Sequence, residues 1–187
     1  MPKVNNPFLW DNLLRQLIQY NMPSATIAGG AVRDYMFAKN VKDIDIFVRD
    51  EEFMNSGVLG QWGADPPRIF TNAGYPGGPV RLRPNEAGYD ERFTVYNVAS
   101  VLEYYPPVQF ILVNGRVHDH IQTFDIEICK MWFRNNELHM TEKALRGFKS
   151  NCSYFDEGSE ARVRYLRNER GYNDVTFINR EGELIAG

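Results

Sequence analysis

Two aspartates stand one residue apart in the stretch DIDIFV, residues 43–48. In an extended strand Asp43 and Asp45 point to the same side, with their Cα atoms about 6.5–7 Å apart. Two neighbouring buried carboxylates repel each other, so one of them tends to take up a proton. Mg²⁺ neutralises both and prefers carboxylate and phosphate oxygens. The pair therefore indicates a Mg²⁺ site, although alternating charge on a surface strand produces the same pattern.

A pair of glycines, Gly29 and Gly30, precedes the aspartates and is followed by Arg33. Glycine at the end of a strand lets the backbone approach a phosphate closely, and the N-terminus of the following helix supplies N–H groups. Arg33, in the first turn of that helix, adds a positive charge, unless it pairs with a helix neighbour. The sequence thus predicts half a nucleotide site, with phosphates at the glycines and metals at the aspartates.

A third carboxylate normally completes a two-metal site, because the attacking hydroxyl and the leaving phosphate both need a metal. The candidate is Asp125, since FDIEIC at 124–129 resembles the start of an apolar strand on the same sheet. The predicted catalytic and metal-binding residues are Asp43, Asp45 and Asp125. The predicted nucleotide-binding residues are Gly29, Gly30 and Arg33.

The elements that must position these residues form a unit of strand, glycine turn, short helix and strand. The first strand is expected at 25–28, the helix at 31–38 and the second strand at 43–48, where Asp45 and Phe47 share one face. The other expected elements are a packing helix at 11–20, strands at 68–71, 92–105, 107–114, 125–133 and 138–140, and helices at 141–151 and 159–172, with Thr141 and Ser159 as N-caps. Residues 57–92 are rich in Gly and Pro and are expected to form a long loop around the strand at 68–71.

The composition is that of one globular unit. The chain has 187 residues, of which 43% are hydrophobic and 13% aromatic, which is ample for a core. A net charge of −3 excludes a protein that coats nucleic acid with its whole surface, so any RNA contact must be regional.

Cysteine usage and hydropathy indicate a reducing, non-membrane environment. Cys129 and Cys152 are far apart and have no paired metal spacing, which argues against a disulfide framework or a zinc site. No apolar stretch approaches the roughly 20 residues that span a bilayer, and the N-terminus lacks the apolar core of a signal peptide. We expect a cytoplasmic protein, in the host cytoplasm if the source is viral, with no membrane partner.

The order of these motifs resembles a known family. GGAVRD at 29–34 followed by DIDIFV at 43–48 is similar to the head-domain signature of nucleotidyltransferases of the DNA polymerase beta superfamily, in particular class II tRNA CCA-adding enzymes and poly(A) polymerases. The family pattern is GG-x-VRD, a short helix and spacer, then D-x-D in a strand. The matching residues are Gly29, Gly30, Val32, Arg33, Asp34, Asp43 and Asp45. FDIEICK and RVRYLRNERGY are more loosely similar to small phage and viral nucleotidyltransferase-like proteins.

The resemblance implies an α/β (α+β) nucleotidyltransferase fold, with a mixed sheet, helices packed on one side and a C-terminal helical appendage. It implies two Mg²⁺ ions on Asp43 and Asp45, with Asp125 in the place of the third carboxylate, and a triphosphate against Gly29 and Gly30. The implied enzyme transfers a nucleoside monophosphate from an NTP to an acceptor hydroxyl, most simply a tRNA-like RNA 3′ end, and releases pyrophosphate. The alternatives are an inactive nucleotide-binding or protein-interaction module, and a toxin-like transferase that modifies tRNA or protein.

The chain leaves little room for the neck, body and tail domains that follow the head in CCA-adding enzymes. We expect a nucleotidyltransferase core at 1–140 and a C-terminal helical extension at 141–187, packed as one compact unit. The last helix carries Arg162, Arg164 and Arg167, which either form a solvated surface or contact an RNA acceptor.

Overall fold

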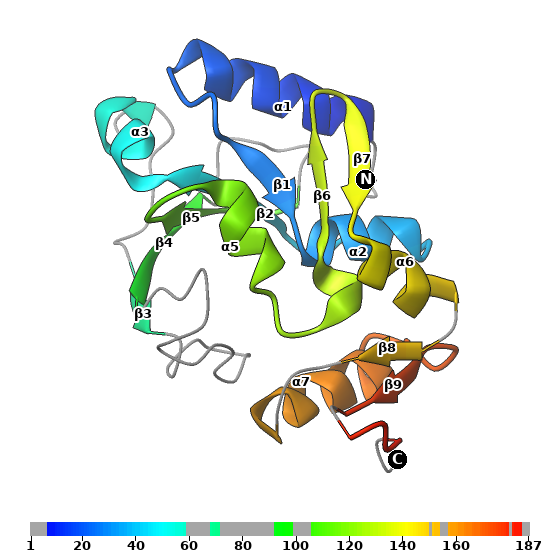
Figure 1. The fold of residues 1–187 in the computed structure, drawn as a ribbon. Coiled ribbons are helices and arrows are strands. Elements are labelled where there is room, and N and C mark those ends of the chain that lie inside the picture. Colours follow the sequence, from blue (N-terminus) through cyan, green and yellow to red (C-terminus); the bar gives the residue numbers. More distant parts are fainter. Residues whose placement is uncertain are drawn as a thin grey trace.

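The protein folds around one mixed sheet. The computed structural model describes residues 7–58, 68–71, 92–98, 106–149, 151–153, 157–179 and 181–184. Within these ranges, seven strands follow the order β3-β4-β5-β2-β1-β6-β7 (Figure 1). The strands are β1 (Thr26–Ala28), β2 (Ile44–Arg49), β3 (Arg68–Thr71), β4 (Arg92–Val98), β5 (Val108–Val113), β6 (Met131–Arg134) and β7 (Glu137–Met140). Strands β2 and β5 are parallel, and every other neighbouring pair in this sheet is antiparallel.

Helices cover this sheet and connect its strands. They are α1 (Pro7–Gln19), α2 (Gly30–Met36), α3 (Asp50–Asn55), α5 (Val117–Gln122), the 3-10 helix η1 (Glu127–Cys129), α6 (Glu142–Lys149) and α7 (Glu157–Asn168). The predicted α+β class with a mixed sheet is confirmed, and the short helix α5 adds cover on the face opposite α1. No helix in the described ranges is both long and apolar enough to cross a membrane.

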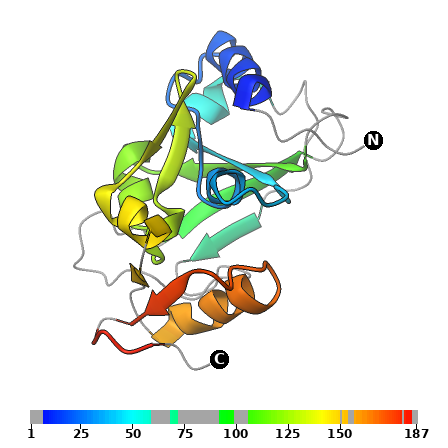
Figure 2. The same ribbon diagram turned by 90° about the vertical axis from the view of Figure 1, so that its right-hand side faces the viewer.

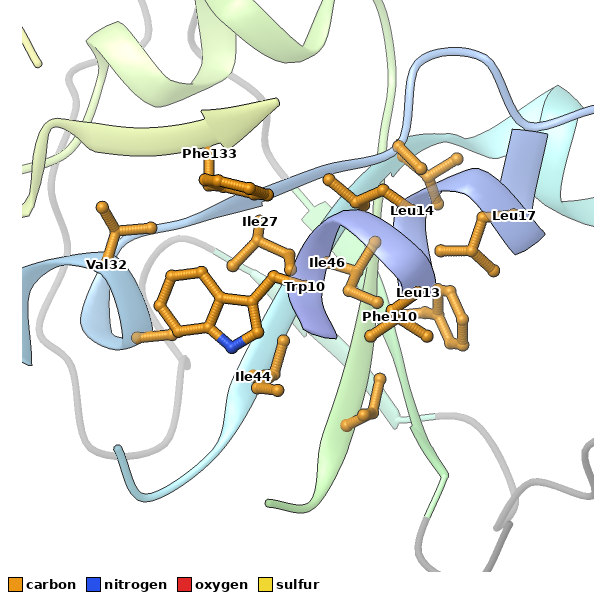
Figure 3. Packing of buried hydrophobic residues seen from close by; sticks show 14 of the residues in the cluster. Trp10, Leu13, Leu14, Leu17, Ile27, Val32, Ile44, Ile46, Phe110 and Phe133 are labelled. Carbon is orange, nitrogen blue, oxygen red and sulfur yellow. The ribbon is translucent and has the colours of Figure 1, made fainter. Parts of the chain in front are cut away.

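The main core lies between α1 and one face of the sheet (Figure 3). Apolar residues of α1 recur at helical spacing, so that Trp10, Leu13 and Leu17 point inward together and are at most 1% exposed. They pack in one cluster with Ile27 of β1 and Phe133 of β6. Burial of such side chains contributes roughly 1.5–3 kcal/mol each, so α1 is held firmly on the face of the sheet formed by the neighbouring strands β1 and β6.

The alternation predicted for β2 is confirmed. Ile44 and Ile46 are fully buried in the α1-side core, whereas Phe47 packs on the opposite face against Val117 and Ile121 of α5. Because side chains alternate along a strand, Asp45 lies on the same face as Phe47. Strand β2 therefore presents its acid on the face that α5 only partly covers.

The C-terminal part of the chain forms a second, smaller layer beneath the sheet (Figures 1 and 2). It holds α7 and a parallel pair of strands, β8 (Asn151–Ser153) and β9 (Thr176–Ile178). Its core joins Leu166 and Phe177 to Ile126 and Ile128 from the segment before β6. That shared core packs the C-terminal segment directly onto the part of the chain that forms the sheet, while the predicted domain boundary at residue 140 stays a prediction.

Several local predictions can be compared with these elements. The continuous strand predicted at 125–133 is wrong: residues 127–129 form η1, and β6 begins only at Met131. Thr141 does cap α6, because its Oγ1 accepts a hydrogen bond from the Ala144 N–H at 3.0 Å. Helix α7 starts at Glu157, two residues before the predicted cap at Ser159. Most of the predicted 57–92 loop and the predicted strand residues 99–105 lie outside the described residues.

Candidate nucleotide and metal site

The paired glycines form a tight turn between β1 and α2. Gly29 has φ +74° and ψ −126°, a conformation that side-chain-bearing residues rarely adopt. Its N–H donates to the Met131 carbonyl of β6 and its own carbonyl accepts from the Arg33 N–H, both at 3.0 Å. A Cβ on Gly29 would lie 3.5 Å from the ring of Phe124. The turn is thus fixed to the sheet on one side and lies against Phe124 on the other.

Asp43 lies just before β2 and Asp45 lies inside it. Both are beside the glycine turn, because β2 pairs with β1, the strand that the turn follows. Asp45 is partly exposed as a residue, yet its Oδ1 is buried and has no hydrogen-bond partner. Burial, and then repulsion from Asp43, raise the pKa of Asp45 from 3.8 to about 7, against the opposing charges of Arg162 and Arg33. Burial also raises the pKa of Asp43, although Lys42 opposes it. Both carboxyls are therefore poorly stabilised as anions within the protein itself.

A divalent cation would supply what these two carboxyls lack. A buried carboxylate oxygen without a partner is costly, and hard oxygen donors are the ligands that Mg²⁺ prefers. The orphaned Oδ1 of Asp45 and the neighbouring carboxyl of Asp43 fit such an ion. No three His, Cys, Asp or Glu side chains form a potential metal-binding group within the residues that the structure describes. The fit therefore rests on Asp43 and Asp45.

Asp125, the third predicted ligand, lies between α5 and η1 rather than in a strand. Its side chain is 1% exposed, and its Oδ1 accepts from Nη1 of Arg162 in α7 at 3.2 Å. The structure thus brings Asp125 together with an arginine of the C-terminal extension, and not with Asp43 and Asp45 as a group of metal ligands. Its role as a third ligand stays a prediction.

Arg33, the predicted phosphate ligand, is 5% exposed and points into the protein. Both its Nη2 and its Nε donate to Asp34 Oδ1, at 2.7 and 3.0 Å respectively. The Nε also donates to the Tyr172 hydroxyl at 3.0 Å, and the Nη1 donates to Cys129 Sγ at 3.2 Å. Burial alone would lower the pKa of Arg33, yet Cys129, Asp34 and Tyr172 together raise it well above its ordinary value. Arg33 is a permanent buried cation whose charge also favours the ionised forms of Asp43 and Asp45.

Arg33 and Asp34 also contact two residues of the C-terminal extension that the sequence did not predict as site residues. The Tyr172 hydroxyl donates to Asp34 Oδ1, and Arg170 Nη2 lies 2.6 Å from Asp34 Oδ2. Burial raises the pKa of Tyr172, so its hydroxyl keeps its proton and remains a donor. We call Arg33, Asp34, Arg170 and Tyr172 the Asp34 cluster. Gly171, with φ +71°, turns the chain between Arg170 and Tyr172, and all three residues end the segment RVRYLRNERGY that the sequence analysis singled out without assigning it a role.

Solved structures described as a tRNA-processing enzyme, a CCA-adding enzyme and a tRNA nucleotidyltransferase have the same fold. A structure described as a tRNA-processing enzyme in apo form matches 91% of this chain with a TM-score of 0.54 and 16% identity. The Thermotoga maritima CCA-adding enzyme complexed with tRNA matches 96% with a TM-score of 0.54 and 18% identity. A tRNA nucleotidyltransferase complexed with a primer tRNA and an incoming ATP analogue matches 84% with a TM-score of 0.51 and 15% identity. The predicted nucleotidyltransferase fold is confirmed.

The match covers only part of those enzymes. This chain spans 45%, 41% and 44% of the three structures, respectively. No curated protein sequence matches it. A protein-family model described as Gad2, Gabija anti-defense 2 family protein, matches residues 6–151, which include the glycine turn, Asp43, Asp45 and Asp125.

Proposed function

The chain belongs to the Gabija anti-defense 2 protein family, and from this membership and its nucleotidyltransferase fold we propose that it is a Mg²⁺-dependent nucleotidyltransferase. It transfers a nucleoside monophosphate from an NTP to an acceptor hydroxyl and releases pyrophosphate. The observation that carries the proposal is the buried, unpartnered Oδ1 of Asp45 beside Asp43 and the positive-φ turn at Gly29. A carboxylate kept in that state is costly unless a ligand uses it.

Each predicted site residue has a role in this reaction. Asp43 and Asp45 hold Mg²⁺, which when bound neutralises charge on the triphosphate. Gly29 and Gly30 let the triphosphate approach the backbone, and Arg33 contributes its positive charge from beneath the turn. Asp125 orients or deprotonates the acceptor hydroxyl. The chain's contribution is thus positioning and charge complementarity, the usual sources of rate in phosphoryl transfer.

The acceptor that we favour is an RNA 3′ end, with a protein hydroxyl second. Two of the similar structures are described as complexes with tRNA, at an identity that supports a shared fold rather than a shared substrate. The family description refers to action against a defence called Gabija. We propose that nucleotidyl transfer is the chemistry of this action, on an RNA or a protein that the defence requires.

Label transfer tests the proposal. The protein is incubated with Mg²⁺ and each of four α-³²P-labelled NTPs, together with total RNA or cell protein, and labelled products are separated on gels. Asp43→Ala and Asp45→Ala should each lower transfer at least about 100-fold, because the charge on the transferred phosphoryl group is no longer neutralised. Asp50→Ala is the matched control: this carboxylate lies just beyond the other end of β2 and is exposed, so transfer should stay at the wild-type level.

A non-catalytic nucleotide-binding module is the second candidate. It is favoured by the pairing of Asp125 with Arg162, which keeps the third carboxylate away from a metal-binding group in the described residues. A wild-type protein that binds NTP in the presence of Mg²⁺ but labels neither RNA nor protein would support this module and contradict the transferase.

A further inference from the structure

Arg162 connects the C-terminal extension to the core at a buried acid. It lies in α7, and its Nη1 is 3.2 Å from Oδ1 of Asp125, 37 residues earlier in the chain. The Asp125 side chain is 1% exposed, whereas that of Arg162 is 26% exposed. The carboxylate is therefore enclosed, while the guanidinium that covers it remains accessible to solvent.

This ion pair lies next to the glycine turn. Phe124, directly before Asp125, has its ring 3.5 Å from the position that a Cβ on Gly29 would take. The same ring packs on Phe47 at a centroid distance of 5.4 Å, and Phe47 shares a face of β2 with Asp45. The positive charge of Arg162 also favours the ionised form of Asp45, and does so more strongly than that of Arg33. Arg162 is thus a cation close to both the glycine turn and Asp45.

Two other arginines, Arg33 of α2 and Arg164 of α7, are less suited to take a ligand. Arg33 is 5% exposed and donates from Nε, Nη1 and Nη2 within the protein. A phosphate could bind its guanidinium only if the Asp34 cluster opened. Arg164, two residues after Arg162 on the same helix, pairs with Glu160 at 3.3 Å on the exposed surface.

We propose that Arg162 is a triphosphate-binding residue and that Asp125 holds it in place in the nucleotide-free protein. The inference rests on the proposed function, because it assigns the phosphate ligand of that same site. A guanidinium binds carboxylate and phosphate with the same planar donor geometry, so it can exchange one for the other and stay paired. When Arg162 turns to the phosphates, the carboxylate of Asp125 is released to face the acceptor hydroxyl. Binding of the first substrate thereby prepares the group that acts on the second.

Binding measurements test this without relying on transfer. Isothermal titration calorimetry measures the Kd of inorganic tripolyphosphate and of α,β-methylene-ATP with Mg²⁺. Arg162→Gln should weaken both by about tenfold or more, the usual effect of losing one charge-assisted phosphate contact. Arg164→Gln, the matched control on the same helix, should bind both like the wild type. Arg162→Gln removes a cationic partner of a buried carboxylate, so the double variant Arg162→Gln/Asp125→Asn provides the folded reference and should show the same loss of affinity.

Asp125→Asn separates the two roles of the pair. The substitution keeps Arg162 but weakens its pairing with residue 125. Tripolyphosphate and α,β-methylene-ATP should therefore bind at least as tightly as to the wild type, while nucleotidyl transfer is lost. Wild-type affinity in both Arg162 variants would overturn the inference and leave the transferase proposal standing. A wild-type protein that binds neither probe would overturn both, and an Asp125→Asn variant that loses triphosphate affinity would overturn the assigned role of Asp125.

Discussion

Asp45 lies in an environment unlike that of an ordinary surface acid, because its Oδ1 is buried without a hydrogen-bond partner. Its folded-state pKa of about 7 lies above the ordinary value of 3.8. Between these two values the unfolded chain releases the proton that the folded protein keeps, so the free energy of unfolding falls as the pH rises. The destabilisation that the ionised Asp45 causes is absent below about pH 4 and fully present above about pH 7. The metal-free protein is therefore expected to be less stable at alkaline pH because of this one carboxyl.

Replacement of Asp45 by Asn should stabilise the metal-free protein at pH 8. The amide has a similar shape and no charge, so the gain is on the order of 2 kcal/mol, or several degrees in Tm. At pH 4 the variant and the wild type should melt together. Differential scanning calorimetry in EDTA at both pH values measures this, with the exposed Asp50→Asn as control. A Tm difference that is the same at pH 4 and pH 8 would contradict the buried-carboxyl explanation.

At the scale of elements, the turn between β1 and α2 depends on a backbone conformation. Gly29→Ala forces a side chain into φ +74° and ψ −126°, a sparsely populated conformation that costs about 1–3 kcal/mol. Gly57 offers a matched comparison, since its φ is +70° and a Cβ there would contact nothing within 4 Å. Chemical denaturation should therefore show a loss of stability for both alanine variants, and the loss at Gly29 should be at least as large because its ψ of −126° also lies outside the left-handed helical region.

Nucleotide binding should distinguish those two variants. Only Gly29 lies beside the aspartates, so Gly29→Ala should weaken NTP binding while Gly57→Ala leaves it unchanged. Equal NTP affinity in both variants, measured under conditions where both are folded, would indicate that the turn has no part in nucleotide recognition.

Local patterns in the sequence were sufficient for the unit that carries the acids. The alternation in DIDIFV and the glycines before α2 depend on neighbours within a few residues, and both predictions match the structure. The segment at 125–130 was wrongly predicted as a strand, because its apolar residues are buried by contacts outside the sheet. Ile126 and Ile128 pack against α7 and β9 rather than within a sheet, and the alternation was mistaken for a strand. Burial by an element that is distant in sequence leaves no periodic signal of its own.

At the scale of the whole molecule, the Asp34 cluster joins the helix after the glycine turn to the C-terminal extension. Arg170 and Tyr172 contact Asp34 across 136 and 138 residues, respectively. No spacing rule in the sequence could have identified these partners, because tertiary packing alone brings them together. The C-terminal extension is consequently a structural support of the GG-x-VRD segment and not only an addition to it.

Tyr172→Phe tests this support. It removes a buried hydroxyl that donates to Asp34 and accepts from Arg33, so the free energy of unfolding should fall by about 1–3 kcal/mol. Tyr165→Phe on α7 is the control, since Tyr165 is 41% exposed and its loss should have little effect. Urea unfolding followed by fluorescence and circular dichroism should give one cooperative transition for both. Two separate transitions would mean that the extension and the core fold independently.

The Asp34 cluster also affects how the protein is made. A ribosome adds roughly 5–20 residues per second, so on the order of ten seconds separate the synthesis of Asp34 from that of Tyr172, 138 residues later. During this interval the nascent chain already carries Arg33 and Asp34, but their partners Arg170 and Tyr172 do not yet exist. The Asp34 cluster can be completed only after translation has passed Tyr172. A product truncated before that point is expected to lack an assembled site and to be a substrate for chaperones and proteases.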